Sequence, residues 1–139
     1  MGLSNTTKLL AGIILITVPT IEFGGTFLLR LLKARQHGYI DNPIRQNLFR
    51  AGHAHAGVLV ILSLVVQLLA DGLGPLTALN LVGRLGAPCA AILMPLGFFL
   101  SVASPQAEKP NSLIMLVYLG ALLLAIGTLA LGILLIGSI

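Results

Sequence analysis

Apolar residues in this chain come in four long runs that are separated by short polar segments. The runs cover about residues 9–32, 48–69, 83–102 and 113–137. Each run is long enough for an α-helix to cross the hydrocarbon core of a bilayer, which takes about 20 residues. The pattern predicts an all-α membrane protein with four transmembrane helices, in which residues 1–139 form a single domain.

Composition supports the membrane class and argues against two others. Of the 139 residues, 57% are hydrophobic and only 9% are charged, whereas about 25% of a soluble protein is charged. Such a chain cannot cover a small globule with polar surface, so the lipid bilayer is its expected partner. Aromatic residues make up 5% and tryptophan is absent, which disfavours a stacking surface for nucleic acid.

The first apolar run differs from the others because it carries Pro19 and Glu22 in its interior. It also follows Lys8 in the manner of a signal peptide, but no cleavage site with small residues closes it. We therefore expect the run to be retained as a membrane span.

Basic residues predict an orientation in the membrane. The ends that hold the first and third loops carry Arg30, Lys33, Arg35, Arg45, Arg50 and Lys109, while the opposite ends carry Lys8 and Arg84. Since basic residues are enriched in cytoplasmic loops, we expect a multi-pass protein of the cell membrane whose first loop is cytoplasmic.

Small residues recur on the last two runs at spacings that allow close helix packing. Gly83, Ala87 and Ala91 form one such row, and Ala121 with Ala125 forms another. Rows of this kind mediate contacts either within one subunit or between copies of a chain.

Three ionisable residues inside the predicted spans are candidates for function, because charged groups are costly in lipid. They are Glu22, His53 and His55. Successive helical residues turn by about 100°, so the two histidines lie about 200° apart and cannot both bind one metal ion from a regular helix. One histidine should face the bundle interior and the other a neighbouring helix, the headgroups or a second subunit. The alternative is that both only bond to the backbone.

The surroundings of the histidines suggest a large flat cofactor. The residues beside them are small, namely Gly52, Ala54, Ala56 and Gly57. Neutral imidazole is a good axial ligand for haem iron, and arginines at the same membrane edge, Arg50 with Arg45 and Arg30, suit the propionates. A zinc or copper site would need more thiolate or imidazole ligands than the lone Cys89 and the loop residue His37 provide.

Several short motifs resemble those of styrene oxide isomerases, a family of small four-span membrane enzymes. Ala54-His55-Ala56-Gly57, reached through Arg50-Ala51, resembles the family's Ala-His-Ser-Gly element at the head of the second helix. Gly97-Phe98-Phe99-Leu100, followed by Ser104-Pro105, is similar to its Gly-Phe-Tyr-Leu segment and Ser-Pro. Phe23-Gly24-Gly25 and Gly38-Tyr39-Ile40 are fainter matches.

The resemblance implies a homotrimer of four-helix subunits with haem b between neighbours. It makes His55 the axial ligand. The residues themselves, independently of the resemblance, give His53, Arg50 and Gly57 as further candidates for the cofactor site. Ferric iron would then act as a Lewis acid that isomerises a small hydrophobic epoxide to a carbonyl compound without net redox change.

Two departures from the family pattern bear on this chemistry. Phe99 stands where the family has a tyrosine beside the substrate, and Ile61 stands near the place of a family asparagine. Phenylalanine has no hydroxyl to position an oxygen. Tyr118, Gln67 or Glu22 are the candidates to replace the lost polar groups in a pocket that includes Phe99.

Two other functions remain open from the sequence. A b-type electron carrier would need a second axial ligand, and no other span offers a histidine. A small membrane protein without haem, structural or part of a transporter, would use the histidines only at the start of its helix.

Overall fold

The computed structural model describes residues 2–139, which form four long helices and one short turn of 3₁₀-helix. The elements are α1 (Asn5–Lys33), α2 (Pro43–Asp71), α3 (Ala78–Ser101), η1 (Ser112–Ile114) and α4 (Met115–Ile136). Four helices, the last taken together with η1, are long and apolar enough to cross a membrane. The predictions of an all-α architecture and of a multi-pass membrane protein are confirmed.

The first three helices begin earlier than the apolar runs that predicted them. α2 begins at Pro43, because the Asn42 side chain accepts a hydrogen bond from the Arg45 amide and caps the helix. α3 begins at Ala78, where Thr77 caps the amide of Asn80 in the same way. Hydropathy detects the apolar part of a helix and misses a polar first turn.

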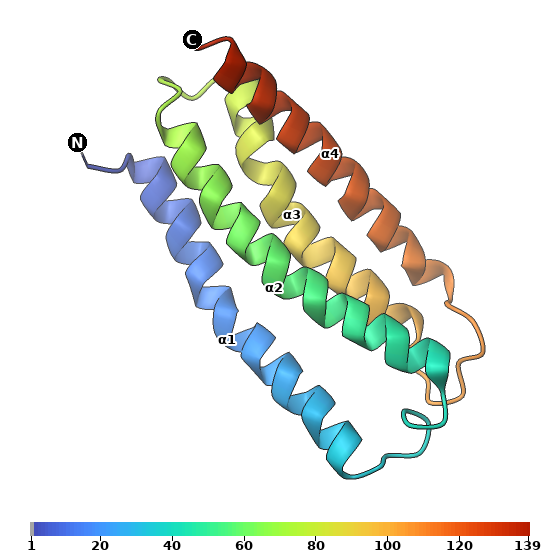
Figure 1. Ribbon diagram of the computed structural model, residues 1–139. Helices are drawn as coiled ribbons and strands as arrows, with labels where there is room; N and C mark the ends of the chain where they lie inside the picture. The colour runs from blue at the N-terminus through green and yellow to red at the C-terminus, as the bar shows by residue number, and fades with distance from the viewer. Residues whose placement is uncertain (1) are drawn as a thin grey trace.

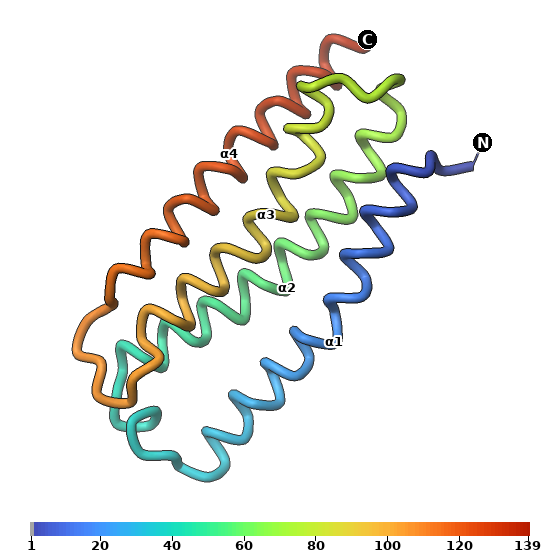
Figure 2. Tube along the Cα trace, turned by 180° about the vertical axis from the view of Figure 1, so that it is seen from behind, coloured from blue at the N-terminus to red at the C-terminus, as the bar shows by residue number. Residues whose placement is uncertain are grey.

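The helices lie side by side in the order of the chain (Figures 1 and 2). α1 packs on α2, α2 on α3, and α3 on α4. α1 and α4 occupy opposite edges of this row in both views. Short turns join antiparallel neighbours throughout, as expected for a small helical membrane domain.

A buried polar network ties three helices together at the end of the bundle that holds the termini. Arg84 on α3 is only 3% exposed. Its Nη1 donates to the Thr7 hydroxyl at 2.9 Å, and that hydroxyl donates to Asp71 Oδ1 at 2.6 Å. The Arg84 Nε donates to Asn80 Oδ1 at 2.7 Å. Thr7 therefore links a buried cation on α3 to a carboxylate on α2.

Gln67 compensates for a proline inside α3. Pro88 has no amide hydrogen, so the carbonyl of Arg84, four residues earlier, loses its donor within the helix. The fully buried Gln67 on α2 donates to this carbonyl through Nε2 at 2.8 Å. The role of Gln67 is thus structural, which differs from the expectation that it replaces a polar pocket residue.

Arg45 performs a similar task at the opposite end. It is 9% exposed, and its guanidinium donates to the carbonyls of Gly38 at 2.9 Å, Val102 at 3.1 Å and Ala103 at 3.3 Å. These contacts join the α1–α2 loop to the end of α3. Arg45 is therefore committed to the fold, which corrects the expectation that it binds a propionate.

Candidate functional site

The structure directs His53 and His55 to different helices. His53 lies against α1, where a Cβ added at Gly25 would be 3.1 Å from its Cε1 and Nε2. His55 lies against α3, with its ring centroid 5.0 Å from that of Phe98. The two histidines belong to separate sites, as their spacing on a helix requires.

The imidazole of His55 is held in one orientation by the backbone. Its Nδ1 lies 2.7 Å from the carbonyl oxygen of Ala51, one turn earlier on α2. Because a carbonyl oxygen only accepts hydrogen bonds, Nδ1 carries the proton and donates it. The lone pair is then on Nε2, which is the arrangement of most metal-binding histidines.

The outer surface of α2 near His55 carries small side chains at its start. Ala54 is exposed, and a Cβ added at Gly57 would meet nothing within 4 Å. Val58 and Ile61, each 65% exposed, continue this surface along the helix. Arg50 is also exposed, one turn before Ala54 on the same helix.

Gly52 has a different explanation from the other small residues. A Cβ added there would approach Phe98 Cβ and Phe99 Cε2 to 3.0 Å. Gly52 therefore makes room for α3 within the subunit. This corrects the expectation that all four small residues form a surface for a cofactor, because Ala56 instead lines a cavity that is partly open to the outside of the bundle.

That cavity lies between α1, α2 and α3 and has a volume of about 400 Å³. We call it the His53 chamber, after the histidine in its wall. Phe99 of α3 lines it opposite residues of α1 that include Thr17 and Thr20. Most of the remaining wall is aliphatic, and Ser63 of α2 adds one hydroxyl.

The hydroxyl groups of the chamber wall are already used. Thr17 donates to the Ile14 carbonyl at 2.7 Å, Thr20 to the Thr17 carbonyl at 2.6 Å. Ser63 likewise donates to the carbonyl of Leu59 at 2.6 Å. In contrast, the ring nitrogens of His53 have no hydrogen-bond partner among residues 2–139, so His53 is the free polar side chain of the chamber.

Glu22 and Tyr118 do not line this chamber. Glu22 is exposed on α1, and Tyr118 is 63% exposed on α4. Of the three residues expected in a substrate pocket, Phe99 alone reaches the chamber within one subunit. The face of α2 that carries His55 is separate from it.

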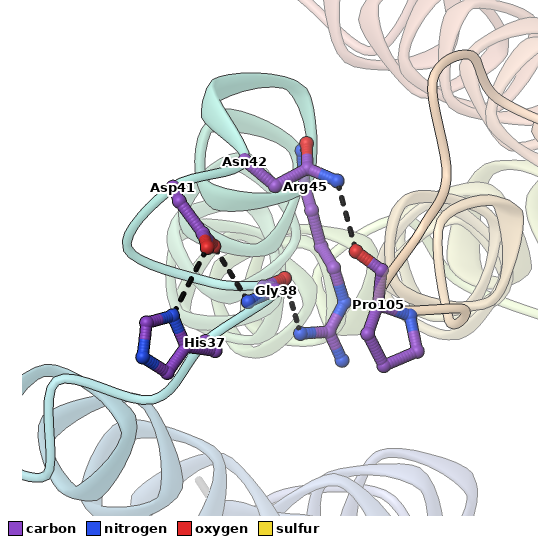
Figure 3. A network of polar contacts seen from close by, with 6 residues as sticks. All are labelled: His37, Gly38, Asp41, Asn42, Arg45 and Pro105. Carbon is purple, nitrogen blue, oxygen red and sulfur yellow. Dashed lines mark hydrogen bonds and ion pairs between the residues drawn. The ribbon is translucent and has the colours of Figure 1, made fainter.

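A second, open hollow lies at the loop end of the bundle, beside the contacts drawn in Figure 3. Asp41 Oδ2 lies 3.2 Å from His37 Nδ1, and Asp41 Oδ1 accepts from the Gly38 amide at 2.5 Å. These hydrogen bonds, that of His37 first, hold the pKa of Asp41 below its ordinary value of 3.8. Asn42 donates to the Pro105 carbonyl at 3.2 Å and joins the two loops. The network stabilises a turn and presents no converging set of catalytic groups.

Within residues 2–139, no three His, Cys, Asp or Glu side chains come together in a way that could hold a metal ion.

Comparisons of the chain with protein-family models, curated proteins and solved structures find no match. Sequence reasoning had missed the His53 chamber, although Gly24 and Gly25, which leave space for the His53 ring, were visible in the sequence.

Proposed function

We propose that this chain is a membrane protein that binds haem b through Nε2 of His55 and isomerises a small hydrophobic epoxide to a carbonyl compound. One observation carries the proposal: the Nδ1 hydrogen bond of His55 to the Ala51 carbonyl, which leaves Nε2 as the free lone pair. The likeness of residues 54–57 and 97–100 to styrene oxide isomerase motifs supplies the reaction class.

The residues around His55 fit a flat cofactor. Ala54 is exposed next to His55 and leaves the helix surface there low enough for a macrocycle to approach, whereas Gly57, two residues after His55, lies on nearly the opposite side of α2. Arg50 is exposed on the same helix and, like the exposed Arg30 on α1, is suited to a propionate. Bound haem would supply a Lewis-acidic iron with an open coordination position.

Neighbouring residues of the chain would hold the imidazole of His55 in place. The Ala51 carbonyl keeps His55 in one tautomer and in one ring orientation. The Phe98 ring, 5.0 Å from that of His55, limits rotation of the imidazole. Since His53 faces α1, the subunit offers one imidazole on this surface, which favours the isomerase over an electron carrier with two axial histidines.

The assembly belongs to the same proposal. The outer surface of α2 beside His55 is open in the single subunit, so we propose a homotrimer in which a neighbouring subunit covers the haem. Glu22 and Tyr118, on the outer surfaces of α1 and α4, would contact a substrate only where a second subunit meets them. In this proposal the first loop faces the cytoplasm of the cell.

The visible absorption spectrum of the detergent-purified protein tests haem binding. We expect a Soret band in the wild type, its loss in His55→Ala, and its retention in the matched control His53→Ala. Haem retained at full stoichiometry in His55→Ala, or lost only in His53→Ala, would refute the assignment of His55. Absence of a Soret band from wild type supplied with haem would leave the haem-free alternative.

A second measurement separates the two haem functions. An isomerase with an exchangeable iron position should show a shifted ferric spectrum on addition of azide. It should convert an aryl epoxide only slowly, because Phe99 lacks a hydroxyl, and Phe99→Tyr should raise that activity. A low-spin spectrum that ignores azide and reduces reversibly would instead identify an electron carrier.

A further inference from the structure

The polar groups of the His53 chamber point to a second ligand site that is independent of the haem. We infer that the chamber binds a small lipophilic alcohol or phenol, whose hydroxyl pairs with His53 and whose apolar body fills the space between α1, α2 and α3. The volume of about 400 Å³ lies within the range of small-molecule pockets.

His53 has hydrogen-bonding atoms that the fold does not use. The ring can donate from one nitrogen and accept at the other, yet it has no partner among residues 2–139. Meanwhile Gly24 and Gly25 leave space for the ring against α1, since Cβ atoms there would lie 3.5 and 3.1 Å from it. The fold thus accommodates a polar ring in the chamber wall and leaves its hydrogen bonds unused.

The backbone of α3 supplies a second polar group. Pro95 cannot donate to the carbonyl of Ala91, four residues earlier, and both residues line the chamber. At Pro88 the equivalent carbonyl accepts from Gln67. No side chain among residues 2–139 donates a hydrogen bond to the Ala91 carbonyl. A hydroxyl suits both sites, because it donates to a carbonyl and either donates to or accepts from an imidazole.

The rest of the wall selects for an apolar body. Ile13, Ile21, Val60, Ile92, Leu96 and Phe99 surround the polar groups. The hydroxyls of Thr17, Thr20 and Ser63 all bond within their own helices. A ligand with many polar atoms would lose its hydrogen bonds to water without replacing them, whereas a molecule with a single hydroxyl would not.

Photolabelling of the full chain in lipid nanodiscs tests the inference. The probe is para-hydroxybenzophenone, and its control is benzophenone, which lacks the hydroxyl, at the same concentration in the bilayer. After irradiation, mass spectrometry locates the adducts. We expect the hydroxylated probe to label the chamber residues of α1 and α3 about fivefold more than benzophenone, as one hydrogen bond predicts.

Four variants identify the groups responsible. His53→Leu should remove the preference for the hydroxyl, while His53→Gln, which keeps hydrogen-bonding atoms, should retain it. Ala91→Phe should fill the chamber and suppress labelling by both probes. Leu129→Phe, on the exposed surface of α4, should change nothing.

Two results would overturn the inference: adducts spread along lipid-facing residues with no preference for the chamber, or a hydroxyl preference that survives in His53→Leu. Circular dichroism identifies variants that fail to fold. If His53→Leu does not fold, the labelling of Ala91→Phe and His53→Gln still tests whether the probe binds in the chamber. The Soret band of the same samples reports on His55, so failure of this site and failure of the haem assignment are distinguishable.

Discussion

The contact of α3 with α4 and the contact of α1 with α2 are built on different principles. Between α3 and α4 the backbones touch, since a Cβ added at Gly86 would lie 2.7 Å from the Cα of Gly127 and 2.6 Å from the Leu123 carbonyl oxygen. On α1, a Cβ at Gly12 would meet nothing within 4 Å, and one at Gly25 would meet only the end of the His53 side chain.

The difference shows how this fold combines stability with internal space. In lipid, helices associate through close van der Waals packing and hydrogen bonds rather than through the hydrophobic effect. Glycines provide the packing between α3 and α4. α1 is instead attached near its ends, through Thr7 to Asp71 on one side and through Phe27 against Phe49 on the other. The middle of α1 is therefore free to border the His53 chamber.

The largest effect should come from one extra methyl group between α3 and α4. Gly86→Ala places a Cβ against backbone, which cannot move aside as a flexible side chain can, so we expect a loss of about 3 kcal/mol in the free energy of unfolding. The matched control Gly25→Ala should cost less than about 1 kcal/mol, because only the His53 ring must shift. Unfolding in mixed detergent micelles, followed by circular dichroism, measures both. Equal losses would show that the two contacts are built alike.

A moderate effect should follow from removing one of the two residues that bond the start of α1 to Asp71, the other being Ser4 at the N-cap of α1. Thr7→Val leaves both Arg84 Nη1 and Asp71 without the hydroxyl between them, at an expected cost of about 1–3 kcal/mol. Hydrogen exchange should rise in the first turns of α1 and stay unchanged in α4. Thr128→Val is the control, because this exposed hydroxyl bonds only within its own helix. Faster exchange in α4 as well would mean that α1 does not loosen independently.

The smallest effect concerns pH and the loop between α1 and α2. The pKa of Asp41 is lowered in the folded chain by its hydrogen bonds to His37 and the Gly38 amide. Its carboxylate therefore stabilises the loop at pH values above its ordinary pKa of 3.8, and this contribution is lost as the pH falls through the lower, folded value. Carbon NMR of the Asp41 carboxyl should titrate below pH 3.8, and His37→Ala should move the midpoint upward. An unchanged midpoint in His37→Ala would exclude that hydrogen bond as the cause.

Local regularities made much of this structure predictable. The four spans follow from hydropathy, and the divergence of His53 and His55 follows from the helical repeat. The two expected rows of small residues differ in burial. Gly83 and Ala87 are buried within the subunit, whereas Ala121 and Ala125 are exposed on α4. Gly86 and Gly127, which those rows did not include, bring the backbones of α3 and α4 into contact.

Other properties depend on which helix lies beside which. Pro88 predicts a carbonyl without a donor, but its partner Gln67 comes from another helix. Arg45 and Arg84 are both basic residues near helix ends, yet both are buried and serve the fold, whereas Arg50 is exposed. A count of basic residues in the sequence cannot distinguish a buried arginine from an exposed one, because burial depends on contacts with other helices.

The sequence by itself determined four apolar helices, their order, and the separation of two histidines on one helix, because hydropathy and the helical repeat act within a segment. Only the tertiary structure decided that His53 faces α1 and the chamber while His55 faces Phe98. That choice depends on the rotation of α2 relative to both neighbours. The rotation is set jointly by close packing and buried hydrogen bonds from residues far apart in the chain, such as Thr7, Gln67 and Arg84.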